Sequence, residues 1–446
     1  MNGEKEMDSQ EIRHSFLDFF KQRDHAVISG ASLLPNNDPT LLYINSGMAP
    51  LKSYFTGAET PPHPRLTNVQ PCIRTNDIDN VGDKSHLTFF EMLGSWSINN
   101  YYKDQAVEFA YGLLTGGFQL PPEKLYVSVY KGSQEIGLPY DTEAHKAWNS
   151  VGIPDSRIVA LGNEDNFWGP AGNYGPCGPC TEVFIDTGLP GDTTSYEKTG
   201  VFNTKDRYVE IWNAGVFMEL YKDESGNISR LKQRNVDTGA GLERLTMAIN
   251  GRASIYETDI YKGLNAVIDE AVPSTDGNVD NIREKRILAD HFRAASFILS
   301  EGVTPGKNRE GYIPRQLIRR SVAAGISIGI EHLPCDDAVD AVVNYSGRDY
   351  PRLMIEASRI KAQIAAEQTA FERVIRQGDK ALQKVMRRDG AHLSGKVAFD
   401  LATTHGLPLD ILSMMVKKQG GSLDAAGFKV QMDQHRLVSR NCPHNG

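Results

Sequence analysis

Residues 86–98, with the sequence HLTFFEMLGSWSI, form a short apolar and aromatic run that is typical of a β-strand. Similar runs occur before and after it in the chain and are broken by Gly, Pro and Asn. They are LLYINSG (41–47), KLYVSVYKG (124–132), CTEVFIDTG (180–188) and RYVEIWNAGVFMELYKD (207–223). Together these runs predict a mostly antiparallel sheet.

Helical patterns occur before and after these runs. Residues 9–24 begin with a Ser and space their apolar side chains at helical intervals, which predicts a helix before the sheet. Residues 188–204 are rich in Gly, Thr and Ser and predict a surface loop. Beyond about Gly241 helical patterns dominate. Among them are 281–300 and 351–388, the second of which is expected as one long helix or two.

The change from strand to helix patterns places a domain boundary near residues 250–280. We therefore predict an α+β fold, with a sheet flanked by helices over residues 1–250 and an all-helical domain over residues 251–446. The second part carries 27 Lys and Arg against 24 Asp and Glu, whereas the first carries 21 against 32. This balance argues against indiscriminate nucleic-acid binding and against a DNA partner, but allows a nucleic-acid surface on the helical part.

The composition excludes several classes of protein. With 40% apolar and 23% charged residues, the chain has the balance of an ordinary globular protein. No apolar run approaches the roughly 18–20 residues that span a bilayer, so we expect no membrane partner. The N-terminus is polar and acidic, which argues against a secretory signal. Five cysteines in 446 residues are typical of reduced thiols in the cytoplasm.

The first set of candidate functional residues joins Cys72-Ile73-Arg74 to the run that begins at His86. We expect a hairpin whose second strand carries both His86 and Phe90. Arg74 could then grip a phosphate through two parallel hydrogen bonds, and Phe90 could stack on a base. An Arg in a surface ion pair and a Phe in the core are the alternative.

A second set lies in VDTGAGLERL (236–245), which has two glycines just before a helical pattern. Gly239 and Gly241 let the backbone pass close to a ligand. Arg244 falls in the first helical turn, where anions bind. A plain tight turn is the simpler explanation of the glycines when they are considered alone.

Two further segments carry polar groups among aromatic ones. DNFW (165–168) and GPCGPCTE (175–182) combine Trp168, which walls a small pocket or fills core, with a C-x-x-C pair. No second Cys or His pair completes a tetrahedral set, so we expect no protein-held zinc. EIWN (210–213) places Asn213 on an aromatic strand, where it binds a ligand or forms a core hydrogen bond.

These segments, in this order, closely resemble the catalytic domain of the alanyl-tRNA synthetase family, which belongs to the class II aminoacyl-tRNA synthetases. The matching stretches include PNNDPTLLYINSGMAPLK (35–52) and TFFEMLGSWS (88–97). Further on, RILADHFRAASFILSEGV (286–303), EGYIPRQLIRR (310–320) and GKVAFDLATTHGLPLDIL (395–412) resemble the family's helical tRNA-binding domain. The resemblance covers roughly residues 9–436.

The resemblance implies a role for each matching residue. Arg74 would bridge the ATP α-phosphate and the amino-acid carboxylate, Arg244 would hold the bent γ-phosphate, and both count as catalytic. Asp237 would receive the substrate's α-ammonium group. By the same resemblance the ATP site comprises Arg74, His86, Phe90, Gly241 and Arg244, and the amino-acid pocket comprises Met92, Trp168, Asn213, Val216, Asp237 and Gly239.

Candidate tRNA-binding residues lie in the second half. Residues 359–388 carry a net charge of +5, and Arg315, Arg319 and Arg320 form a second basic cluster. The resemblance places Asn308 and Asp410 near positions that read base edges. A solvated helix face is the alternative for the basic residues.

The sequence also departs from the family pattern. Only Thr75 separates Arg74 from Asn76-Asp77, where the family has a longer loop. Ala214-Gly215 stands in place of one residue, which predicts a bulge, and Glu219 stands in place of a Gln. Pro314 and Gln316 are expected to interrupt an Arg-rich helix. The family's editing and C-terminal domains do not follow, which is typical of a truncated chain or a free-standing paralogue. The differences inside the catalytic part favour the paralogue.

The sequence therefore predicts an enzyme that activates alanine, or another small amino acid, with ATP and Mg²⁺ and transfers it to tRNA. A paralogue that hands the amino acid to another acceptor, or serves a biosynthetic pathway, is the second interpretation. A non-catalytic tRNA-binding regulatory module is the third, and Arg74, Asp237 and Arg244 argue against it. The choice among alanine, glycine and serine, and the oligomeric state, stay open at this point.

Overall fold

The structure is a computed structural model that describes residues 6–36, 38–188, 207–273 and 281–441, apart from the side chains of residue 410 and residues 436–441. The chain forms two compact units, Met1–Ala266 and Val267–Gly446. None of the helices described combines the length and the apolar character that a membrane span requires.

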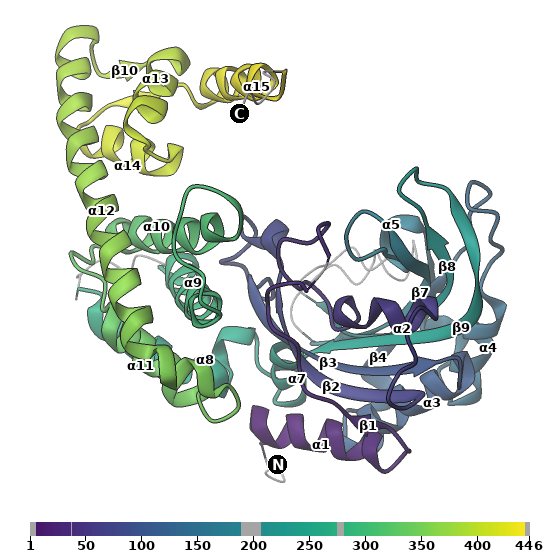
Figure 1. Cartoon of the computed structure of the whole chain (residues 1–446). Helices are drawn as coiled ribbons and strands as arrows, with labels where there is room; N and C mark the ends of the chain where they lie inside the picture. The colour runs from purple at the N-terminus through teal and green to yellow at the C-terminus, as the bar shows by residue number, and fades with distance from the viewer. Residues whose placement is uncertain (1–5, 37, 189–206, 274–280, 442–446) are drawn as a thin grey trace. The chain divides into compact units, whose positions relative to one another are not determined.

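The first unit is built on a sheet that has nine strands within the described residues. Their order is β1-β2-β3-β9-β8-β7-β4-β5, with β6 paired to β7. The pairs β1–β2 and β4–β5 are parallel and the others antiparallel, so the predicted mostly antiparallel sheet is confirmed (Figure 1). The strands are β1 (Ala26–Val27), β2 (Arg65–Ile73), β3 (Phe89–Ile98), β4 (Leu125–Tyr130), β5 (Ile158–Leu161), β6 (Phe167–Trp168), β7 (Gly175–Asp186), β8 (Tyr208–Lys222) and β9 (Ile228–Gly241).

Helices flank this sheet, and the first one confirms the helix predicted from residue 9. It begins after Asp8, whose carboxylate accepts the Glu11 N–H at 2.7 Å while Glu11 accepts the Asp8 N–H at 3.2 Å. Its buried side includes Ile12, Phe16 and Phe20, and α1 and α3 lie along the lower side of the sheet in Figure 1. The helices are α1 (Ser9–Lys21), α2 (Lys52–Thr56), α3 (Lys103–Gly112), α4 (Thr142–Ser150), α5 (Asn163–Asn166), α7 (Leu242–Ile249) and α8 (Asp259–Ala271), which continues into the second unit.

One predicted strand is wrong. Residues 41–47 form bends and irregular backbone instead, in which Tyr43 and Ile44 are buried. Ile44 donates its N–H to the Leu33 carbonyl at 2.8 Å, and its own carbonyl accepts the Ile73 N–H at 2.8 Å. The apolar run therefore covers the core without joining the sheet, because its backbone bonds go to separate segments.

The second unit is helical apart from one two-stranded parallel sheet, which departs from the all-helical domain predicted there. The patterns at 281–300 and 351–388 are both confirmed as helices, the latter as one continuous helix of 39 residues. The first of these packs against three neighbours and is buried from Ile287 to Ser300. The elements are α9 (Ile282–Ser300), α10 (Tyr312–Ser327), α11 (Cys335–Ser346), α12 (Pro351–Asp389), β10 (His392–Leu393), α13 (Gly395–His405), α14 (Leu409–Lys418), β11 (Ser422–Leu423) and α15 (Ala425–Asn441).

Two other expectations concern single segments. Pro314 does not break α10, because it is the third residue of that helix, where backbone N–H groups have no partner within the helix. The interruption expected at Pro314 and Gln316 is therefore wrong. The loop expected at 188–204 lies, after Gly188, outside the described residues.

Gly94 on β3 lacks a side chain where the indole ring of Trp96 packs against the strand. Trp96 is fully buried, and a Cβ atom added to Gly94 would lie 2.2 Å from the Trp96 Cζ2 atom. Any side chain at position 94 must therefore displace a packed indole ring.

Gly94→Ala should lower the free energy of unfolding by about 1–3 kcal/mol, because overpacking a core strains it. Urea denaturation measures the change. Gly116→Ala is the control, since an added Cβ there meets nothing within 4 Å. Equal stability of the two variants would contradict the packing described for Trp96.

Candidate active site

A cavity opens where β2 ends, β3 begins and β9 passes into α7. The antiparallel register sets Phe90 opposite Cys72 and Met92 opposite Gly241, which brings three distant segments together. The cavity and the open solvent at its mouth together take up about 550 Å³ of empty space. It is lined by Arg74, Asp77, Ser85, His86, Leu87, Phe90, Met92, Glu210, Ile211, Gly239, Gly241, Glu243 and Arg244. Seven of these are residues that the sequence singles out: Arg74, His86, Phe90, Met92, Gly239, Gly241 and Arg244.

Arg74 directly follows β2 and is half-buried. Its Nε donates to the Asn45 carbonyl at 3.4 Å, and its Cζ lies 4.7 Å from the centre of the Phe90 ring. Within the described part of the chain, no carboxylate lies at ion-pair distance from it. Arg74 is therefore not the surface ion pair considered as an alternative. A cation that stacks on a ring and lacks an acidic partner is suited to an anionic ligand.

Arg244 lies in the first turn of α7, as predicted. Its Nη1 donates to the Glu210 carboxylate at 3.0 Å and to the Glu210 carbonyl at 3.2 Å. Beside this pair, Glu182 on β7 is half-buried. Loss of solvent around its carboxyl group, together with the Glu210 and Asp165 carboxylates, holds the pKa of Glu182 well above its usual range. Arg244 thus supplies a positive charge to a part of the site that also holds the Glu182 and Glu210 carboxyl groups.

His86 lines the cavity but does not lie on the strand that carries Phe90. Asp83 accepts the backbone N–H groups of Ser85 and His86 at 2.9 and 2.8 Å and also hydrogen-bonds to the His86 ring. These bonds hold a turn, and β3 begins only after it, at Phe89. The placement of His86 on the second hairpin strand is therefore wrong.

Asp237 lies on β9 and is not among the residues that line the cavity. Its Oδ1 accepts a hydrogen bond of 2.8 Å from the indole nitrogen of Trp96, and Val216 is its register partner on β8. Burial raises the pKa of Asp237 to about 7, although the Trp96 hydrogen bond lowers it. Among the described residues, no Lys or Arg lies at ion-pair distance. A buried carboxylate without a cation is costly unless a ligand supplies the positive charge.

Asn213 and Trp168 do not line the cavity either. Asn213 is the register partner of Gly239, and its Nδ2 donates to the Glu182 carboxylate at 3.3 Å. Its Oδ1 is buried and has no hydrogen-bond partner. Trp168 is half-buried and pairs with Gly178 on β7. In the sheet register, only Asn213 adjoins a residue of the cavity wall.

The predicted bulge on β8 is confirmed. Thr181 pairs with Gly215 and the next residue, Glu182, pairs with Asn213, so Ala214 is extra. A bulge of this kind turns the side chains on either side of it. It therefore sets how Asn213 and Val216 approach β9.

Cys177 and Cys180 are buried on β7, and burial raises the pKa of Cys177 to about 11. Metals bind the thiolate, which such burial disfavours. In the chain as far as it is described, no group of three or more His, Cys, Asp and Glu could hold a metal ion.

The sequence does not single out Trp96, Glu182 or Glu210 as site residues. Each of the three lies inside a motif quoted above, but the side chain that it hydrogen-bonds to lies in a distant segment of the chain. Trp96 bonds to a residue 141 positions away and Glu210 to one 34 positions away. Local patterns contain no signal for such pairs.

The candidate tRNA-binding residues lie in the second unit and do not form one exposed basic patch. Arg315 and Arg319 share the Glu367 carboxylate, with Nε–Oε1 distances of 3.3 and 2.6 Å. Arg320 donates to the ring of His291 at 3.3 Å, and Asn308 is exposed. The side chain of Asp410, on α14, is outside the described residues.

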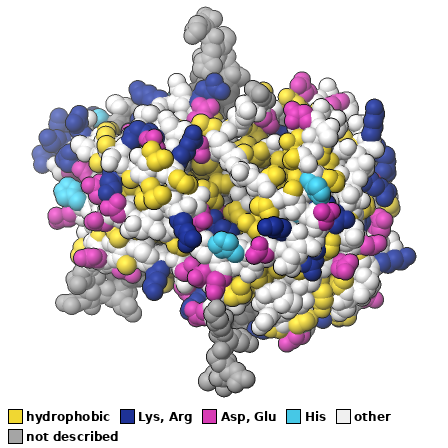
Figure 2. All heavy atoms as spheres, turned by 60° about the horizontal axis from the view of Figure 1, so that its bottom comes forward, with side chains coloured by type: hydrophobic (Ala, Val, Ile, Leu, Met, Phe, Trp, Pro, Cys, Tyr) yellow, Lys and Arg dark blue, Asp and Glu magenta, His cyan; other side chains and the backbone are white. Residues whose placement is uncertain are grey.

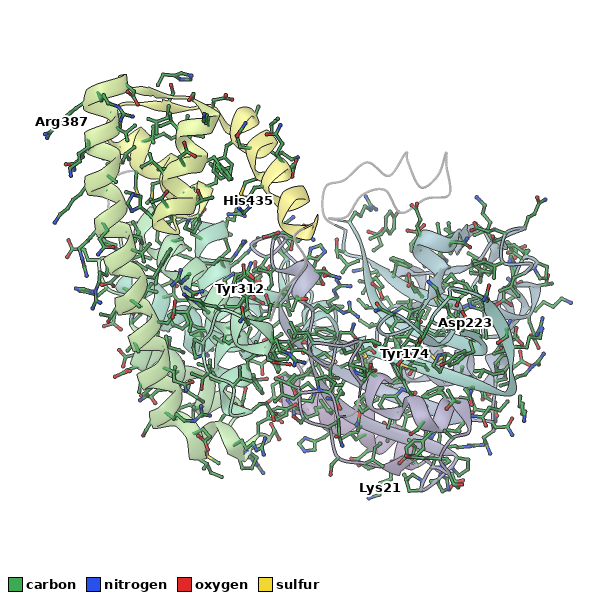
Figure 3. All side chains as sticks on the ribbon, turned by 45° about the horizontal axis from the view of Figure 1, so that its top comes forward. Lys21, Tyr174, Asp223, Tyr312, Arg387 and His435 are labelled. Atoms are coloured by element: carbon green, nitrogen blue, oxygen red, sulfur yellow. The ribbon has the colours of Figure 1, made fainter. Side chains whose placement is uncertain are left out.

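One face of the molecule carries basic and acidic side chains mixed together. On the face that Figure 2 presents, Lys and Arg are interspersed with Asp and Glu. Along α12, Arg387 is exposed and points away from the helix (Figure 3). The basic residues of α12 therefore include solvated ones, as the alternative interpretation expects.

Comparison with known proteins identifies the family. Residues 11–445 match the family described as class II (A) tRNA synthetases, and the chain belongs to it. Its relatives there include the alanine–tRNA ligase of Borrelia hermsii, which is 39% identical over 440 residues that cover 97% of this chain and 73% of the relative. The alanine–tRNA ligase of Rubrobacter xylanophilus is 38% identical over 446 residues, which cover 97% of this chain and 50% of that protein. The chain thus spans between half and three quarters of these relatives.

Solved structures give a more distant likeness. An apo histidyl-tRNA synthetase of S. aureus matches with a TM-score of 0.33 and 12% identity, covering 56% of this chain and 70% of that one. A pyrrolysyl-tRNA synthetase of Desulfitobacterium hafniense matches with a TM-score of 0.32 and 14% identity, covering 57% and 74%. Likenesses at this level add nothing to the assignment.

Asp237→Asn should stabilise the protein above neutral pH. Because the folded-state pKa of Asp237 is raised from 3.8 to about 7, its contribution to stability is present at low pH and is lost as the pH rises through about 7. Asn carries no charge to desolvate, so the variant should gain on the order of a few kcal/mol at about pH 8 and less at about pH 5.

Urea denaturation at the two pH values measures this difference. Asp223→Asn is the control, because Asp223 lies in the turn between β8 and β9 (Figure 3) and hydrogen bonds from Asn227 lower its pKa. An Asp237→Asn protein that is less stable than wild type at both pH values would show that the carboxylate serves the fold alone.

Proposed function

We propose that this protein activates alanine with ATP as alanyl-adenylate and transfers the alanine to tRNA. The observation that carries the proposal is a pair of opposite charges, Arg74 and Asp237, on the two sides of β3. Neither has a protein counter-ion among the described residues. A free amino acid offers the complementary pair, a carboxylate and an α-ammonium group. The alanine–tRNA ligase relatives support alanine as that amino acid.

The chemistry fits what these residues supply. Adenylate formation is in-line attack of the amino-acid carboxylate on the α-phosphorus of ATP, with pyrophosphate as the leaving group. Such a step needs positioning and charge neutralisation more than a protein nucleophile. We assign Arg74 to the α-phosphate and the substrate carboxylate, and Arg244 to the phosphate tail. Phe90 and His86 belong to the same ATP site, with the Phe90 ring against the adenine.

The cavity wall suits a nucleotide with its metal ion. A Cβ atom on Gly241 would meet only Phe90, at 3.9 Å, so the backbone there stays open to a ligand. When bound, Mg²⁺ neutralises phosphate charge, and it is held largely by the phosphates themselves. Glu210, a carboxylate of the lining, is the residue that we would expect to assist.

Packing around Met92 favours a small amino acid. Its sulfur accepts the Gly47 N–H at 3.0 Å, and a Cβ atom on Gly239 would lie 2.7 Å from that sulfur. Met92 thus fills the space between β9 and the turn at Gly47, next to the strand that carries Asp237. The methyl side chain of alanine fits this proposal. Glycine and serine are the competing substrates, and their binding free energies should differ from that of alanine by only about 1–3 kcal/mol.

We assign activation to the first unit and tRNA binding to the second. Asn308, Arg315, Arg319, Arg320 and Asp410 are the residues proposed to contact tRNA. A phosphate would have to draw Arg315 or Arg319 away from Glu367, so we expect modest, salt-sensitive affinity. The four described cysteines are free, which supports a reducing compartment, and we propose the cytoplasm.

Arg74→Ala should slow alanine-dependent ATP–pyrophosphate exchange by roughly 100-fold to 1000-fold, because one electrostatic contact to the transition state is lost. ATP binding should change much less. Arg230→Ala, which removes an exposed cation from the same sheet, is the control and should behave like wild type. If folded wild-type protein with Mg²⁺ exchanges pyrophosphate with none of the twenty amino acids, the activation proposal fails.

Arg319→Ala combined with Arg320→Ala should weaken tRNA binding about equally for all tRNAs and flatten its salt dependence by about one unit per lost contact. Glu367→Gln should act in the opposite direction, since it releases two arginines from their carboxylate. Titration of tRNA at two salt concentrations measures both effects. If no tRNA binding is detected even at low salt, the proposal that this protein binds tRNA is wrong.

A further inference from the structure

The carboxylate of Asp237 is held by one side chain, the indole of Trp96. The two residues are register partners on β9 and β3, and the Nε1–Oδ1 distance is 2.8 Å. Trp96 is 0% exposed and Asp237 is 6% exposed. No other hydrogen bond to the Asp237 carboxylate occurs among the described residues.

The indole ring is itself locked in place. A Cβ atom on Gly94 would lie 2.2 Å from its Cζ2 atom, and a Cβ atom on Gly47 would lie 2.8 Å from the same atom. Two glycines from different segments therefore form the slot that Trp96 fills. In such a slot the ring cannot turn, so its N–H group has a fixed direction.

We propose that Trp96 is a positioning residue for amino-acid binding, because its indole N–H fixes one carboxylate oxygen of Asp237 and leaves the other oxygen to accept the substrate's α-ammonium group. This inference rests on the proposed function and adds a residue to it. A carboxylate that is anchored at one oxygen loses little freedom when a ligand binds the other.

The hydrogen bond also favours the charged form of Asp237. An N–H donor stabilises a carboxylate over the neutral acid, and here it opposes the effect of burial. The register partner from β8 is the apolar Val216, and the Asp237 carboxylate contributes to the raised pKa of the Cys72 thiol on β2. Burial holds the pKa of the Cys72 thiol far above neutral, so this thiol does not titrate in the same range.

Trp96→Phe keeps an aromatic ring and removes the N–H group. It should raise the KM for alanine in pyrophosphate exchange by about 10-fold or more, the usual effect of a lost hydrogen bond to a charged group, while the KM for ATP changes little. Its pH profile for kcat/KM of alanine should shift to higher pH, because Asp237 then ionises later. Trp148→Phe is the matched control, since Trp148 is also buried and donates to Thr181 at 2.7 Å.

A second comparison separates positioning from general stability. In an Asp237→Asn background, Trp96→Phe should cost much less in kcat/KM for alanine than in wild type, because the carboxylate that it orients is gone. If the Trp96→Phe variant fails to fold, a measurement on the wild-type protein still tests the positioning role. The indole N–H resonance of Trp96, one of four tryptophans, should shift with pH near neutrality and with added alanine, and that of Trp148 should not.

The outcomes distinguish the two proposals. Wild-type protein that exchanges pyrophosphate, together with a Trp96→Phe variant that matches Trp148→Phe in alanine KM and pH profile, would overturn the positioning role alone. A Trp96 resonance that ignores both pH and alanine would do the same. Wild-type protein without exchange would overturn the proposed function instead.

Discussion

The pairing of β3 with β2 on one side and β9 on the other is the constraint on which the site depends. Every residue of β3 is buried, and its register sets Phe90 beside the end of β2 and Gly94 opposite Gly239. Side chains alternate between the faces of a strand, so a slip by one residue would turn Phe90 and Met92 away from the cavity. The bulky Trp96 and the bare Gly94 oppose such a slip, since the slot fits the indole in one register only.

Much of this arrangement could be predicted from local sequence. Four of the five aromatic runs form strands, and the long helical patterns form helices, because periodicity reports which side of an element is buried. The motifs around Arg74, Phe90, Gly239 and Arg244 do meet in one cavity. Residues 41–47 are the exception, because an apolar run that packs on the core has the same local sequence pattern as a strand, and only its hydrogen-bond partners distinguish the two.

What could not be predicted is the pairing of polar groups across long separations. Glu367 on α12 accepts hydrogen bonds from Arg315 and Arg319 on α10. These two arginines are therefore ion-paired and do not form the free basic cluster that the sequence predicts. Asp83 accepts the backbone N–H of His86, which places His86 in a turn before the strand begins. The partner of Asp237 is an indole, and composition alone would not distinguish this tryptophan from one that only fills core.

The length of α12 carries a consequence for how this fold can vary. At about 1.5 Å per residue, its 39 residues extend roughly 58 Å, and the last turns contact β10 and α13. Each residue rotates a helix by about 100°, so the loss or gain of one residue in its middle would swing α13 to α15 around the helix axis by more than a quarter of a turn. Substitution of the exposed side chains leaves that spacing intact. We therefore expect related proteins to keep the length of this helix. Where the length does change, we expect insertions or deletions of about seven residues, because seven residues make almost two full turns and return α13 to nearly the same side of the helix axis.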